Sequence, residues 1–231
     1  LGRLLEKIGQ SFATNRMAFE IILVDDGSTD DTEEVARAAA KELPVSVILH
    51  QQNKGLAAAL NTGLRAAVDA AAAGDIIITM DADDTHPPNI IDRLVTIVDA
   101  GFDVAIASRY QPGAEVVGVP WRRVWLTKAA SYLFRLLMPI PGVRDYTCGY
   151  RAYRYQALKS TIDYYGNEFV SEPGFSCMVD VLLKMRRFKF DMAEVPFVLR
   201  YDRKVGDSKM PVGRTAWKTL TLFARRRFGG Y

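Results

Sequence analysis

The chain has 231 residues, 49% hydrophobic and 25% charged, a composition that indicates a globular protein and excludes a disordered or fibrous one. Its net charge of +3 is unevenly distributed: residues 1–100 carry 8 basic and 16 acidic side chains, whereas residues 101–231 carry 22 basic and 11 acidic ones. The first part therefore suits a metal ion, and the second part suits an anion or an anionic surface.

The first half of the chain alternates predicted strands and helices, which indicates a mainly parallel sheet with right-handed crossovers. Strands are expected at 19–24, 45–50, 75–80 and 104–108, and helices at 1–12, 31–42, 56–72 and 89–100. Because the chain begins inside a predicted helix and ends on an arginine cluster, further segments are expected at either end.

The pattern changes after residue 109. Helices are expected at 121–138, 175–186 and 212–228, a short strand at 151–157, and a strand at 189–200 whose Pro196 favours an edge or bulge position. Loops are expected between them, including 111–120 and 201–211. No signal peptide is visible, and no apolar run approaches the roughly 20 residues of a spanning helix. Cys148 and Cys177 have no metal-ligand spacing, which favours a reducing compartment.

The end of the third predicted strand is the most informative segment. Ile76–Met80 is an apolar run typical of a buried strand, and three carboxylates follow within four residues, at Asp81, Asp83 and Asp84. Ligands of open α/β sheets bind outside such strand ends. Carboxylates this close repel one another unless a divalent cation lies between them. The segment therefore indicates a metal site, with a solvated acidic turn as the alternative.

Four motifs follow strand ends in order: Val24–Asp30, Asn53-Lys54-Gly55, Asp81-Ala82-Asp83 with His86-Pro87-Pro88, and Ser108-Arg109-Tyr110. Together they resemble family 2 glycosyltransferases, and within them the dolichyl- or polyprenyl-phosphate sugar transferases. The resemblance implies an α/β GT-A fold over 1–211, a single domain with a Rossmann-like, mainly parallel sheet flanked by helices. Residues 1–110 would be its nucleotide-sugar-binding half and 111–211 its mixed acceptor half, followed by a basic amphipathic helix at 212–231 near a membrane.

The resemblance also implies a nucleotide-diphospho-sugar donor and Mg²⁺ or Mn²⁺. Asp81 and Asp83 would handle ribose, sugar and metal. Thr85 stands where such enzymes commonly have glutamine, and Asp84 replaces an apolar residue, so Asp84 is a candidate third oxygen ligand. The remaining donor-binding residues would be Asp26 at the base, Asp25 and Asp30 nearby, and Asn53 and Lys54 lining the nucleotide pocket.

Arginines, whose planar fork matches phosphate oxygens, follow the sheet. By resemblance, Arg109 and Arg123 fall at acceptor-phosphate and donor positions and complete a catalytic set with Asp81 and Asp83. By the same resemblance, the acceptor phosphate would also be bound by Thr127, one helical turn beyond Arg123, and by Arg203 and Lys209, which belong to a segment resembling a Gly-x-Ser-Lys loop. A phosphate acceptor is already anionic near neutral pH, so it needs positioning more than a general base.

The expected reaction is an inverting transfer of a hexose from a GDP-mannose or UDP-glucose type donor to a polyprenyl or dolichyl phosphate. Basic helices bearing aromatic residues, at 121–138 and 212–228, favour a location at the cytoplasmic face of a membrane, peripheral to it or anchored in it. Nucleic acid is disfavoured, since the first half is acidic and no known binding motif is present. The pattern specifies no oligomeric state.

Three alternatives stay open at this point. Transfer to a sugar or protein hydroxyl would need a carboxylate base, for which Asp145 or Glu172 are candidates. A phosphatase of the haloacid-dehalogenase type would use Asp81 as nucleophile and Asp83 as general acid, although the order of its motifs is wrong here. A nucleotide-sugar-binding module without activity is the third. The run Asp145–Arg151 would shape a sugar pocket or form a structural loop, His86 would support the turn, and His50 would pack.

Overall fold

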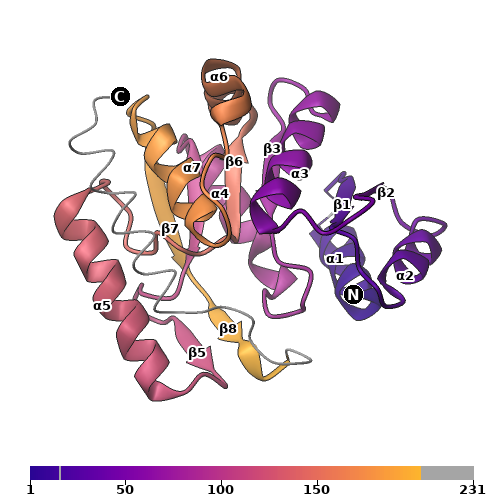
Figure 1. The fold of residues 1–231 in the computed structure, drawn as a ribbon, viewed down its shortest axis with the longest axis horizontal. Helices are drawn as coiled ribbons and strands as arrows, with labels where there is room; N and C mark the ends of the chain where they lie inside the picture. Colours follow the sequence, from indigo (N-terminus) through magenta and orange to yellow (C-terminus); the bar gives the residue numbers. More distant parts are fainter. Residues whose placement is uncertain (16, 204–231) are drawn as a thin grey trace.

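The structure, a computed structural model, describes residues 1–15 and 17–203 (Figure 1). Its centre is a four-stranded sheet with the spatial order β3 (Ile76–Thr79), β6 (Arg151–Arg154), β4 (Val104–Ser108) and β7 (Met192–Pro196). β6 runs antiparallel to both β3 and β4, whereas β4 and β7 are parallel. All five residues of β4 are buried, as expected for an apolar strand inside a sheet with covered faces.

A second, two-stranded sheet lies at one side of the molecule. It pairs β1 (Ile21–Asp25) with β2 (Val45–Leu49) in parallel. α1 (Gly2–Asn15) and α2 (Thr32–Ala39) pack against each other beside this pair, and Leu5, Leu23 and Ala36 form a small core there. α3 (Leu56–Ala70) contacts both β1 and β3, so it joins the two sheets (Figure 1).

The main hydrophobic core is formed by the four-stranded sheet and the helices against it. α4 (Ile91–Asp99), preceded by the 3-10 turn η1 (Pro88–Ile90), packs on β4, β6 and β7. α6 (Tyr155–Tyr165) contacts α3 and α7 (Ser176–Arg186), and α7 is buried from Ser176 to Met185. The turn η2 (Gly166–Glu168) links α6 to the loop before α7.

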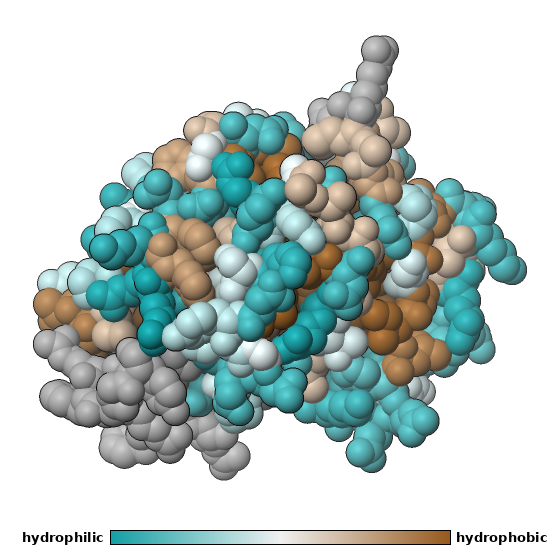
Figure 2. All heavy atoms as spheres, turned by 90° about the horizontal axis from the view of Figure 1, so that it is seen from above, coloured by the Kyte–Doolittle hydropathy of each residue, from teal (hydrophilic) through white to brown (hydrophobic). Residues whose placement is uncertain are grey.

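α5 (Trp121–Leu137) lies on the opposite side of the molecule from β1 and β2 (Figure 1). Next to it, β5 (Glu115–Val117) and β8 (Val198–Arg200) form a short parallel pair, followed by the turn η3 (Tyr201–Arg203). α5 buries Phe134 and Ser131 but leaves several large apolar side chains exposed. Seen from above, the surface of the molecule is largely hydrophilic, with separate apolar patches between hydrophilic side chains (Figure 2).

The predicted elements of the first half are confirmed to within a few residues, and Pro196 does end the edge strand β7. Three expectations were wrong. The segment 151–157 is a strand only to Arg154 and continues as α6, and 189–200 divides into β7 and β8 around the buried Phe197. The expected loop 111–120 contains β5. The sheet also has a feature that the sequence analysis did not address, because the antiparallel β6 lies between β3 and β4.

The predicted helix 212–228 lies outside the described residues. Across residues 1–15 and 17–203, none of the helices combines the length and the apolar character that crossing a bilayer requires.

Candidate functional site

The carboxylate of Asp26, at the end of β1, organises the turns around it. Its Oδ1 accepts hydrogen bonds from Nδ1 of His50 at 2.7 Å and from the N–H of Lys54 at 3.0 Å, and its Oδ2 accepts from the N–H of Gly55 at 2.7 Å. Burial by itself raises the pKa of Asp26, but these hydrogen bonds outweigh burial and lower it. Asp26 is therefore an ionised side chain that fixes the end of β2 and the start of α3.

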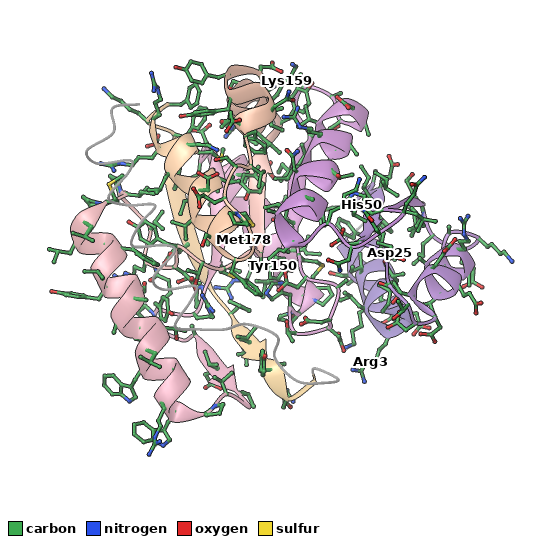
Figure 3. The ribbon with its side chains drawn as sticks, viewed as in Figure 1. Arg3, Asp25, His50, Tyr150, Lys159 and Met178 are labelled. Atoms are coloured by element: carbon green, nitrogen blue, oxygen red, sulfur yellow. The ribbon has the colours of Figure 1, made fainter. Side chains whose placement is uncertain are left out.

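His50 is a member of this cluster that sequence reasoning assigned only to packing. Its ring is buried, and Nε2 lies 3.0 Å from the hydroxyl of Thr62 on α3. Figure 3 shows His50 and Asp25 at the ends of neighbouring strands. The signal in the sequence is its position: a histidine that ends a strand parallel to the one that carries Asp25 and Asp26.

The other predicted donor residues are Asn53, Lys54, Asp25 and Asp30. Asn53 and Lys54 are exposed beside Asp26. The absence of a side chain at Gly27 lets the backbone of Asn53 pack closely against it, because a Cβ there would lie 2.7 Å from the N atom of Asn53. Asp25 accepts a hydrogen bond from the N–H of Ser28 at 2.9 Å. Asp30 lies at the start of α2, where its carboxylate accepts from the N–H of Thr32 at 3.1 Å.

Asp81 and Asp83 follow β3 and are held in different ways. The side chain of Asp81 is 45% exposed, and its backbone N–H donates to Nδ1 of His86 at 3.0 Å. Oδ1 of Asp83 accepts from the hydroxyl of Thr85 at 2.6 Å and from its N–H at 3.2 Å. Thr85 is buried, so its visible role is to orient Asp83.

Asp84 points its carboxylate at α1. Its Oδ2 lies 2.6 Å from Nη2 of Arg3, and its Oδ1 lies 2.8 Å from Nζ of Lys7. Burial alone would raise the pKa of Asp84, but the two cations lower it. The prediction that Asp84 is a third metal ligand disagrees with these contacts, because both of its oxygens are bound by cations.

His86 supports the turn from inside, as its position predicts. The ring is buried, stacked on Tyr150 at a centroid distance of 4.9 Å and edge-on to Phe197 at 5.8 Å. Burial lowers the pKa of His86, which favours the neutral ring. Because Nδ1 accepts from the Asp81 N–H, the proton of a neutral ring is on Nε2, which lies 3.8 Å from Oδ2 of Asp81.

Gly149 borders Asp81, and Met178 packs against Gly149. A Cβ on Gly149 would lie 2.9 Å from Cε of Met178 and 3.6 Å from Oδ1 of Asp81. Figure 3 shows Met178, at the start of α7, close to Tyr150 near the centre of the molecule. The start of α7 therefore packs against the segment that borders Asp81.

Arg109 and Asp145 form a buried ion pair. Nε and Nη2 of Arg109 each donate to a different carboxylate oxygen at 2.7 Å, and Nη2 also donates to the Thr147 hydroxyl at 2.6 Å. Burial by itself lowers the pKa of Arg109 and raises that of Asp145, but the opposite charge beside each outweighs burial and reverses both shifts. A carboxylate that is fully buried and ionised in this way is poorly suited to act as a general base.

A cavity of about 560 Å³ lies between α5 and the segment that follows β4. Its lining combines cations with aromatic rings: Arg109, Trp125, Lys128, Tyr132, Arg135 and Arg144. Thr127 lies on α5, where its hydroxyl donates to the carbonyl of Val124 at 2.9 Å. The side chains of Arg123 and Arg203, and all of Lys209, lie outside the described part of the chain. Their assignments stay predictions.

The strand end with Asp81 and Asp83 fits a divalent metal that a ligand would help to bind. Within residues 1–15 and 17–203, no group of three or more His, Cys, Asp or Glu side chains is arranged to hold a metal ion. Mg²⁺ commonly binds through one or two carboxylates together with substrate phosphates and water. Two aspartates, of which Asp81 is half exposed, supply that kind of hard oxygen ligand.

Solved structures share the architecture. One is glucosyl-3-phosphoglycerate synthase from Mycobacterium tuberculosis in complex with Mn²⁺, uridine diphosphate and glucosyl-3-phosphoglycerate. It aligns with a TM-score of 0.64 and 20% sequence identity, over 99% of this chain and 76% of that one. The fold is that of the GT-A glycosyltransferases.

The sequence comparison is more specific. The chain belongs to glycosyl transferase family 2, whose model matches residues 1–162. It is 38% identical to a polyprenol monophosphomannose synthase of Mycolicibacterium smegmatis, over 82% of this chain and 69% of that protein. It is 34% identical to a dolichol-phosphate mannosyltransferase of Pyrococcus furiosus over 90% of this chain, but the match spans 55% of that relative. The chain is a glycosyltransferase, and the phosphatase interpretation of Asp81 and Asp83 is set aside.

Proposed function

We propose that the chain transfers a hexose from a nucleotide-diphospho-sugar to a polyprenyl phosphate, with Mg²⁺ or Mn²⁺ bound at Asp81 and Asp83. This acceptor is supported by the names of two relatives, a polyprenol monophosphomannose synthase and a dolichol-phosphate mannosyltransferase. The observation that carries the proposal is the cavity beside α5, in which four cations and aromatic side chains line one space. Such a lining suits the phosphate and the first apolar units of an amphiphilic acceptor.

On the donor side, Asp25, Asp26, Asn53 and Lys54 would bind the nucleotide. Asp81 and Asp83 would bind the metal and the adjoining parts of the donor. A divalent cation, when bound, supplies charge stabilisation for the departing diphosphate.

On the acceptor side, Arg109 lines the cavity and donates to the hydroxyl of Thr147, two residues before Gly149, which borders Asp81; the cavity therefore lies near the proposed donor site. Its guanidinium is aligned by Asp145 and held only 18% exposed, which limits its movement. A phosphate oxygen is already a nucleophile without proton removal, so positioning by such cations is the main requirement. The engagement of Asp145 with Arg109 also argues against Asp145 as a base for a hydroxyl acceptor.

We further propose that α5 contacts a membrane surface. Five large apolar side chains on it are between 58% and 69% exposed: Trp121, Trp125, Leu126, Tyr132 and Leu136. Arg122 lies over the Trp121 ring at 5.5 Å, and Lys128 lies over the Trp125 ring at 5.9 Å. Aromatic residues next to cations are typical of helices at the interface of an anionic bilayer. An acceptor with a long apolar chain would be presented at such a surface.

The experiment is a product analysis. The protein is incubated with GDP-mannose, UDP-glucose and related donors, Mn²⁺, and a short polyprenyl phosphate, and lipid-linked sugar is measured by mass spectrometry. Asp83→Asn should lower turnover by about 100-fold or more, since the metal contributes several kcal/mol of charge stabilisation. Asp31→Asn, at an exposed acid beside α2, is the matched control and should not change it. No product from any donor, or glycosylation of hydroxyl acceptors instead, would contradict the proposal.

A further inference from the structure

The turn that carries Asp81 and Asp83 is tied to the first helix through Asp84. Lys7 donates to both carboxylate oxygens of Asp84, at 2.8 and 2.9 Å, and Nε of Arg3 donates to Oδ2 at 2.9 Å. Arg3 and Lys7 are four residues apart on α1, so they lie on one face of the helix. These contacts join residues 77 and 81 positions apart in the chain.

The backbone at Asp84 has a cost that these contacts offset. Its φ is +59°, a left-handed conformation that few residues other than glycine adopt, although aspartate and asparagine tolerate it best. The carboxylate is also buried, and a buried charge is unfavourable without partners. Lys7, 31% exposed, is the stronger partner, because the pair with Arg3, 64% exposed, is weakened by solvent.

α1 is itself fixed to the nucleotide side of the molecule. Leu5 on α1 forms a small core with Leu23 of β1 and Ala36 of α2. The Ser11 hydroxyl donates to the carbonyl of Pro88 at 3.4 Å, just beyond the acidic turn. α1 therefore contacts both the strand that ends in Asp25 and the turn that carries Asp81 and Asp83.

We propose that Arg3, Lys7 and Asp84 form a clamp that positions the Asp81–Asp83 turn relative to the nucleotide-binding end of β1. Asp84 is then a positioning residue. The proposal rests on the metal site proposed above. Without the clamp the turn populates other conformations, and the apparent affinity for the metal falls with the fraction of the competent one.

The sign of one substitution separates the clamp from direct ligation by Asp84. If Asp84 were a ligand, removing the neighbouring cation with Lys7→Met would free its carboxylate and strengthen Mn²⁺ binding. If Asp84 acts through the clamp, the same substitution weakens Mn²⁺ binding. Asp84→Asn weakens binding in either case, but asparagine tolerates the left-handed backbone, so this variant removes the charge with little added strain.

The test measures Mn²⁺ binding to the full chain in the presence of GDP or UDP, by electron paramagnetic resonance and without any acceptor. We expect Lys7→Met and Asp84→Asn each to weaken Mn²⁺ binding about tenfold. Because both act through the same contact, the double variant should bind Mn²⁺ as tightly as whichever single variant binds it less tightly. Arg37→Gln is the matched control, because Arg37 also pairs with an acid, Glu33, but on the exposed face of α2. Unchanged or tighter binding in Lys7→Met would overturn the clamp.

Hydrogen exchange of residues 82–90 in the absence of metal tests the clamp independently of metal binding. The clamp predicts faster exchange in both variants and not in Arg37→Gln, and equal exchange in all of them would overturn it. A wild-type protein that binds no Mn²⁺ with either nucleotide would contradict the proposed metal site, while hydrogen exchange would still decide on the clamp.

Discussion

Replacement of Asp145 by asparagine tests the buried ion pair at the centre of the site. The carboxylate accepts from the N–H groups of Arg109, Thr147 and Cys148 as well as from the Arg109 guanidinium. Asparagine keeps the shape but has one acceptor oxygen, and its NH₂ group would face these donors. Leaving one member of a buried pair uncompensated costs about 3–5 kcal/mol. For a chain of this size that lowers Tm by about 6–20 °C.

The assay is urea unfolding at pH 7 of Asp145→Asn, Arg109→Met and the double variant. Removing both charges should cost less than the sum of the single substitutions, because neither charge is then left buried alone. Asp163→Asn is the control: its pair with Lys159 is exposed to solvent, so its loss should leave the stability almost unchanged. Single losses below about 1 kcal/mol that simply add would refute the assignment of a coupled buried pair.

Three further predictions concern the buried acids, the turn at Gly27 and the exposed face of α5. Asp84 and Asp145 have pKa values lowered on folding, so their stabilisation is present above the ordinary aspartate value near 3.9 and is lost as the pH falls through the folded values. Urea unfolding between pH 2 and 7 should therefore show a shallower acid decline in Asp84→Asn and Asp145→Asn than in the wild type; an identical decline would contradict the pairing. Gly27→Ala should destabilise the protein by about 1–3 kcal/mol and weaken nucleotide binding. The reason is that φ is +72° and the added Cβ would meet backbone atoms of residues 52 and 53. Thermal unfolding measures the loss of stability, and calorimetry measures the loss of nucleotide affinity. Arg122→Gln should weaken binding to anionic vesicles by about 1 kcal/mol, roughly fivefold, in a sedimentation assay; Arg93→Gln, on α4, is the control, and equal effects of both would argue against contact through α5.

The sequence predicted those elements whose apolar or proline pattern follows directly from their burial or their place in the sheet. The apolar run at 104–108 predicted β4 because the whole strand is buried, and Pro196 indicated an edge because proline cannot donate within a sheet. α6 was missed because β6 is four residues long and the helix starts at the next residue, so two periods meet inside one short segment. The antiparallel direction of β6 is set by its pairing with β3 and β4, which no local pattern records.

In the candidate site, too, local features were predictable and long-range contacts were not. The residue types at Asp26, Asp81 and Asp83 and their places at strand ends were predictable from the motifs. What the side chains contact was not, because the partners are distant in sequence. Asp84 is held by residues of α1 that lie 77 and 81 positions earlier, and Arg109 by Asp145, 36 positions later. A carboxylate next to a metal motif is predicted to be a ligand, because the sequence does not show which cations bind it in the fold.

The acceptor is the central claim, and one comparison tests it most directly. A polyprenyl phosphate and the polyprenol of the same length are offered in parallel with the preferred nucleotide sugar and Mn²⁺, and glycosylated lipid is quantified by mass spectrometry. We predict a product from the phosphate and none from the alcohol, since no general base is required for an anionic acceptor and the cations lining the cavity suit its charge. Equal transfer to both lipids, or transfer to the alcohol alone, would contradict the account.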